Sequence, residues 1–174
     1  MRKWSRAAVV FLVSALAASA VPAVAHDHKP PRAILRSPGD EQRGRAWSSD
    51  WTRADGKFCV SGVGDGIPNY RRKAMTWNPS NPIRLYLYKK QKPKKVKVRM
   101  HRRLDEDGSP QGKGRRARIR LRDKVLDNGR RIWIAKFRGP DVRHLFLSAR
   151  AVWQDVEGCN VSQSLDFAFH LRRR

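Results

Sequence analysis

The chain has 174 residues, of which 39 are Lys or Arg and 15 are Asp or Glu, giving a formal net charge of +24. This length suits one domain with a buried core and argues against a second domain. So large a positive charge attracts polyanions such as nucleic acids and anionic envelope polymers. The charge alone does not separate a polyanion-binding surface from a basic surface that only keeps the protein soluble.

The first 25 residues have the features of a cleavable secretory signal. Three cations precede an apolar run over residues 7–20, and Ala23-Val24-Ala25 provides a small-x-small cleavage site. The apolar run is too short to span a bilayer stably, and no lipid-accepting cysteine or twin-arginine pair accompanies it. We therefore expect a helical signal peptide at residues 1–25, cleavage after Ala25, and a secreted or cell-surface protein that begins at His26.

The remaining chain is predicted to form one domain of short strands. Residues 26–31 form a flexible tail, residues 32–171 form the domain, and residues 172–174 form a basic C-terminal tail. Apolar-polar alternation predicts strands at residues 33–35, 83–88, 96–101, 116–122, 132–137, 145–153 and 165–171. Turn residues such as Pro38-Gly39 and Asn128-Gly129 separate them. Alternating strands cannot bury one face alone, so we expect an antiparallel β-sandwich.

The two cysteines of the exported chain, Cys59 and Cys159, are expected to form one disulfide, because export takes them to an oxidising compartment. Closing a loop of about 100 residues restricts the unfolded chain by up to about 4.7 kcal/mol in the entropy model. Two free thiols or part of a metal site are the alternatives. No other Cys or His lies near either cysteine in the sequence.

Five of the predicted strands follow one another in an order that resembles an immunoglobulin-type sandwich. They are the segments at 83–88, 96–101, 132–137, 145–153 and 165–171. The cysteines depart from the usual inter-sheet pair, because Cys59 precedes these strands and Cys159 falls in the loop before the last. The resemblance implies an all-β, antiparallel, immunoglobulin-like architecture.

Loose motifs occur near both ends of the exported chain. Gln42-Arg43-Gly44 is followed by Ser48, Trp51 and Cys59, and the back of the chain has Trp153-Gln154-Asp155-Val156-Glu157-Gly158-Cys159 and Phe167-Ala168-Phe169-His170-Leu171. In these motifs the chain resembles small exported proteins of actinobacteria that are of unknown function. The resemblance implies the same β-sandwich and carries no activity.

Two cationic strands provide the candidate binding residues. Nine cations fall within residues 89–103. Alternation places the cations of 95–101 on one face of their strand and the apolar residues on the other face. Residues 116–122 alternate in the same way. If the connection at 104–114 makes a hairpin, both rows of cations share one sheet face, which a bound polyanion would stabilise. If the second strand crosses to the other sheet, the positive charge is divided between the two sheets. The hairpin predicts a site formed by Lys95, Lys97, Arg99, Arg116, Arg118, Arg120 and Arg122.

Anionic cell-envelope or extracellular polymers are the expected partners of such a site. Residues 89–103 contain no aromatic residue, which argues against sequence-specific recognition of nucleic acid. A monomer without a membrane span in its mature form is expected. The chain has no Gly-x-Ser-x-Gly or His-Glu-x-x-His motif, so we do not expect an enzyme.

The alternative function is metal binding at the new N-terminus. Cleavage after Ala25 would expose His26-Asp27-His28, whose α-amine, two amides and third-position imidazole can surround Cu(II) or Ni(II) in a square plane. The ligands would be His26 and His28. The other histidines, His101, His144 and His170, lack ligand spacing and are expected at the surface or partly packed.

Overall fold

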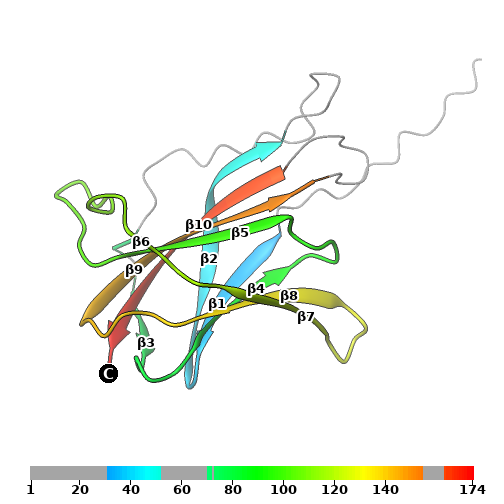
Figure 1. The fold of residues 1–174 in the computed structure, drawn as a ribbon, viewed down its shortest axis with the longest axis horizontal. Coiled ribbons are helices and arrows are strands. Elements are labelled where there is room, and N and C mark those ends of the chain that lie inside the picture. Colours follow the sequence, from blue (N-terminus) through cyan, green and yellow to red (C-terminus); the bar gives the residue numbers. More distant parts are fainter. Residues whose placement is uncertain (1–30, 52–69, 72, 155–162) are drawn as a thin grey trace, which may run out of the picture.

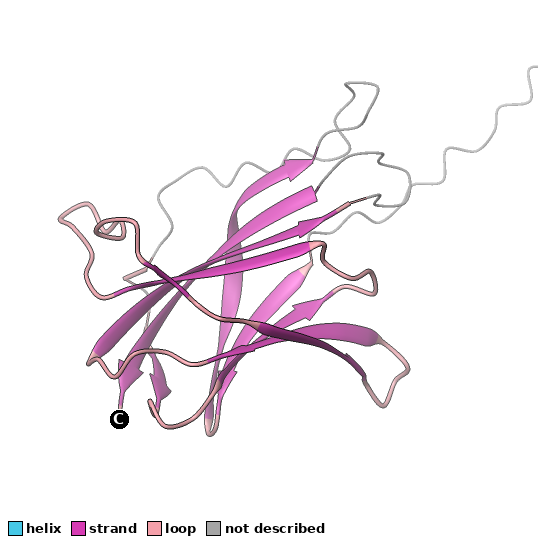
Figure 2. Cartoon of the chain, viewed as in Figure 1, coloured by secondary structure: helices cyan, strands magenta, loops and turns pink. Residues whose placement is uncertain are grey.

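The computed structural model describes residues 31–51, 70–71, 73–154 and 163–174, and this part of the chain contains strands and turns but no helix (Figures 1 and 2). The all-β prediction is thus confirmed. The strands are β1 (Arg32–Ser37), β2 (Asp40–Trp51), β3 (Met75–Trp77), β4 (Ile83–Tyr88), β5 (Lys95–His101), β6 (Arg115–Arg116), β7 (Arg120–Val125), β8 (Arg131–Phe137), β9 (His144–Trp153) and β10 (Gln163–Arg173).

The strands form two antiparallel-rich sheets that share β2. Along the hydrogen-bonded path the order is β6-β5-β9-β10-β2-β1-β4-β8-β7, and β3 pairs in parallel with β10. The first part of β2 pairs with β1 and its second part pairs with β10, so this strand passes from one sheet to the other. We call the sheet with β1, β4, β8 and β7 sheet A, and the sheet with β10, β9, β5, β6 and β3 sheet B.

Gly44 lies where β2 changes sheets. A Cβ atom at this position would be 2.7 Å from Cζ of Phe169 and 3.2 Å from Cδ1 of Phe167, both of which are buried rings. Glycine permits this close approach because it has no side chain. The two phenylalanines can therefore pack directly against the backbone of the shared strand.

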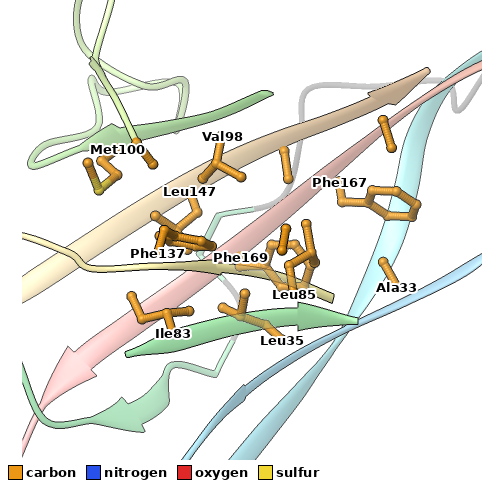
Figure 3. Packing of buried hydrophobic residues seen from close by; sticks show 14 of the residues in the cluster. Ala33, Leu35, Ile83, Leu85, Val98, Met100, Phe137, Leu147, Phe167 and Phe169 are labelled. Carbon is orange, nitrogen blue, oxygen red and sulfur yellow. The ribbon is translucent and has the colours of Figure 1, made fainter. Parts of the chain in front are cut away.

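The hydrophobic core lies between the two sheets. Figure 3 shows Leu35 and Ile83 from sheet A and Val98 and Leu147 from sheet B pointing into the same space. Alternate residues of strands such as β1, β4 and β9 enter this core because successive side chains of a strand point to opposite faces. The inner faces pack on one another, and the arrangement is that of a β-sandwich.

The boundaries of the predicted strands follow the sequence pattern closely, whereas β2 and β3 are not among the predicted strands. β4 has the predicted bounds, and the other predicted core strands extend slightly beyond theirs. β10 continues through Arg173, into the segment expected to be a basic tail, because Arg172 and Arg173 pair with β3 and Arg173 forms a 2.8 Å ion pair with Asp141. The predicted strand at 116–122 is divided between β6 and β7.

Candidate functional site

The cations of β5 lie on the outer face of sheet B, as the alternation predicts. Val98 and Met100 are buried in the core, whereas Lys95 and Arg99 are exposed on the opposite face. Arg116 of β6 is the register partner of Arg99, so these two cations lie directly opposite one another. Nη1 of Arg99 also donates a 2.6 Å hydrogen bond to the carbonyl oxygen of Lys113.

The chain crosses from sheet B to sheet A immediately after this pair. The amide of Ala117 still donates to the carbonyl oxygen of Val98, but Arg120 already pairs with Lys136 of β8. Ala117, Ile119 and Leu121 pack against the core throughout the crossing, which is why the alternation continues while the pairing partner changes. Figure 1 shows the chain running from β6 in one layer to β7 in the other.

The seven predicted site residues therefore do not share one face, because the crossing arrangement is the one observed. Lys95, Lys97, Arg99 and Arg116 lie on sheet B; Arg120 and Arg122 belong to β7 of sheet A, and the exposed Arg118 lies in the crossing segment. The charge is divided between two sheets.

Arg150 of β9 adds a cation that the sequence analysis did not select. It is the register partner of Lys97, so a second pair of cations lies directly opposite next to Arg99 and Arg116. The alternation of Leu147, Ala149 and Ala151 in β9 was the available signal, because it directs Arg150 outward. We call the set Lys95, Lys97, Arg99, Arg116 and Arg150 the β5–β9 surface.

Repulsion among these cations lowers the pKa of Lys97. Its pKa is lowered by the neighbouring Lys95 first, and by Arg116 and Arg99 in addition. Like charges at neighbouring sheet positions are unfavourable, so a bound anion would remove part of this repulsion.

One carboxylate, Asp166 of β10, lies beside the β5–β9 surface. Its side chain is only 7% exposed, and Arg150 binds both of its oxygens, with an Nη2–Oδ2 distance of 2.7 Å. Such a bidentate pair offsets the cost of burying the carboxylate. Asp166 therefore neutralises Arg150, and among the described residues no carboxylate forms an ion pair with the cations of β5 and β6.

A small cavity of about 260 Å³ lies next to this pair and is lined by Lys97, Arg99, Ser148, Arg150 and Asp166. Tyr70 is buried close to it, and burial raises the pKa of Tyr70 to about 12, with the nearby Asp166 adding to the increase while a hydrogen bond with Ser148 opposes it. The phenol therefore stays protonated at neutral pH. The cavity offers the cations of Lys97 and Arg99 and the hydroxyl group of Ser148, and its one lining carboxylate, Asp166, is held by Arg150, so an anionic group would bind on the Lys97–Arg99 side.

The three described histidines occupy different environments. Nδ1 of His144 lies 3.0 Å from Nε2 of His170, and Phe146 stacks on His170 with ring centroids 4.5 Å apart, so these two are partly packed as predicted. The prediction is wrong for His101, which is only 5% exposed. A Cβ on Gly114 would be 2.4 Å from Cε1 of His101, so the turn at Gly114 closes directly over the ring and buries it.

The predicted metal and disulfide residues, His26, His28, Cys59 and Cys159, lie outside the described residues. Within the described ranges, no cluster of three or more His, Cys, Asp or Glu side chains has the arrangement of a metal site. The same ranges contain no helix that is long and apolar enough to cross a membrane.

Comparison with known proteins gives no match: no family model, curated protein or solved structure is significantly similar to this chain.

Proposed function

We propose that this protein is an exported binding module that holds anionic cell-envelope or extracellular polymers on its β5–β9 surface. The observation that carries the proposal is the facing of Arg99 and Arg116 on the outer face of sheet B, with Lys95 and Lys97 beside Arg99 on the same strand. The one carboxylate described beside them, Asp166, is already bound by Arg150. A polyanion would supply the missing counter-charges.

Binding would gain free energy in two ways. A polyanion releases the counterions condensed on it when protein cations replace them, and this term weakens as the salt concentration rises. It also relieves the repulsion that lowers the pKa of Lys97. One anionic group fits the cavity beside Ser148, and the following groups of the polymer would lie along the exposed cations of β5 and β6.

The finer, immunoglobulin-like description of the fold is also a proposal, and it is supported by the strand pairings. The five strands that resemble an immunoglobulin core divide as that fold requires, with β4 beside β8 in one sheet and β5-β9-β10 in the other. β1 and β7 flank the first pair, and β6 lies beside β5. This likeness concerns architecture, and the function rests on the surface alone.

The test compares two variants that lose the same charge. The first is Lys97→Gln with Arg99→Gln on the β5–β9 surface. The second is Arg138→Gln with Arg143→Gln, two exposed residues in the β8–β9 connection. Affinity for purified teichoic acid and for heparin is measured over a range of salt concentrations. We expect the first variant to lose more affinity and to show a shallower salt dependence than the second.

Equal losses in the two variants would mean that net charge alone drives binding, and the defined surface would then be rejected. Arg172 and Arg173 are unsuitable for the control, because both belong to β10 and Arg173 is paired with Asp141. Thermal unfolding of both variants checks that the substitutions leave the fold intact.

A further inference from the structure

A second row of cations crosses the outer face of sheet A. Arg36 of β1 is opposite Arg84 of β4, Arg84 is opposite Lys136 of β8, and Lys136 is opposite Arg120 of β7. Adjacent strands are about 4.8 Å apart, so these four positive charges, one on each strand, form a row about 14 Å long. We call these four residues the sheet A cation row. Residues from four separate segments of the sequence form it, so no local motif reveals it.

A row of apolar side chains runs parallel to the sheet A cation row, two residues away from it along each strand. It consists of Ile34, Tyr86 and Ile134, which are register partners, and Arg122 continues it at β7. The guanidinium carbon of Arg36 lies 4.9 Å from the centre of the Tyr86 ring. A groove of about 360 Å³ lies over the β4, β8 and β7 part of both rows, and its lining includes Arg84, Lys136, Arg120, Tyr86, Ile134 and the carboxylate of Asp123.

Most cations of this groove have no acidic partner. Glu41 binds Arg36 at one end of the row, at 3.0 Å, and Asp123 lies 3.7 Å from Arg131. In the part of the chain that the structure describes, no carboxylate forms an ion pair with Arg84, Lys136, Arg120 or Arg122. The groove therefore carries an uncompensated positive charge next to an apolar strip.

We propose that this groove is a second binding site and that its occupant is single-stranded nucleic acid. Phosphodiester groups would contact the cation row, whose arginine guanidiniums match phosphate geometry, and bases would lie on the apolar row beside Tyr86. An anionic polymer without flat apolar groups would contact only the sheet A cation row. Contacts of this kind are independent of base sequence, because every base has a face that can stack.

This site is separate from the β5–β9 surface. Ile83, Leu85 and Ala135 of sheet A and Val98 and Leu147 of sheet B all enter one buried core, so the outward faces of the two sheets lie on opposite sides of the molecule. The inference goes beyond the proposed function, because it concerns other residues and another class of ligand.

The experiment measures binding of a labelled oligothymidylate to the secreted protein by fluorescence anisotropy. The test variant is Arg84→Gln with Lys136→Gln, and the matched control is Arg138→Gln with Arg143→Gln. We expect the test variant to lose about tenfold in affinity and the control to lose much less. Arg120→Gln with Arg122→Gln is a second test variant on a different strand, which keeps the result interpretable if the first pair disturbs folding.

Tyr86→Leu identifies the class of ligand. It should weaken oligothymidylate binding about fivefold or more, because stacking on the aromatic ring is lost. It should leave unchanged the binding of poly(glycerol phosphate), which has the phosphodiesters but no bases. If Tyr86→Leu leaves oligothymidylate binding unchanged, the groove recognises phosphate alone and the assignment to nucleic acid is wrong.

Equal losses in the test and control pairs would reject the groove as a site. Neither outcome bears on the β5–β9 surface, which is tested with other residues. Failure of the proposed function is therefore distinguishable from failure of this inference.

Discussion

Arg99 of β5 and Arg116 of β6 are register partners, and no described carboxylate forms an ion pair with either. Directly opposite side chains of an antiparallel pair are about 5 Å apart at Cβ, where like charges repel. The fold tolerates this repulsion at the edge of sheet B. Stability and the proposed polyanion binding would therefore make opposite demands on this pair.

Exchanging one charge of the pair should separate these two demands. Arg116→Glu places a carboxylate opposite Arg99, and we expect the free energy of unfolding to rise by about 0.2–1 kcal/mol. The same change should weaken binding of heparin. Denaturant unfolding and heparin affinity are measured together, with Arg130→Glu in the β7–β8 turn as the control. A variant that is both less stable and unchanged in binding would contradict the prediction.

Alkaline pH should destabilise the protein through Tyr70. Its pKa of about 12 in the folded protein exceeds the ordinary value of 10.0, so the folded state holds this proton more tightly than the unfolded state. The resulting stability is complete below pH 10 and is lost as the pH rises toward 12, by at most about 3 kcal/mol. Tyr70→Phe should show a smaller loss of unfolding free energy over this range.

Denaturant unfolding below pH 10 and between about pH 10 and 12 measures this difference. Tyr88→Phe, a half-buried residue of β4, controls for the removal of a phenol. If the wild type and Tyr70→Phe lose stability in parallel, Tyr70 does not set the alkaline limit.

The disulfide prediction can now be connected to the fold. Trp51 at the end of β2 and Trp153 at the end of β9 both pair with Gln163 at the start of β10. The strand ends that precede the segments with Cys59 and Cys159 therefore lie on either side of the start of β10. Intact-mass analysis of secreted protein should give a chain that starts at His26 and is two hydrogens lighter than its reduced form. Free thiols would exclude the disulfide, and a retained leader would exclude the export route.

Copper binding remains a prediction from the sequence. Titration of Cu(II) into the mature protein should reveal one tight site, because an N-terminal amine, two amides and the His28 imidazole form a square-planar ligand set. The site should be lost in His28→Ala and when a residue is added before His26. Binding that survives both changes would assign the metal to other ligands.

The sequence predicts the strands that have a clear apolar-polar alternation, because that pattern is local, but it does not predict β2 or β3. Val98 and Met100 alternate with Lys97 and Arg99, and that period of two is sufficient to assign β5 and its two faces. The partner of each strand depends on contacts between distant segments. Nothing near Arg116 indicates that the chain leaves sheet B at Ala117, and nothing near Arg84 indicates Lys136 as its neighbour. The sheet A cation row was therefore missed, and the seven predicted residues were divided between two sheets.

The two cationic faces lie on opposite sides of one hydrophobic core, which fixes the distance between them. Packed sheets are separated by about 10 Å, and the outward side chains add to that thickness. Two polymer strands bound to one molecule would be joined and at the same time held apart by the width of the sandwich. If both proposed sites bind polymer, the protein would act as a spacer in a polymer network and would set a minimum mesh size.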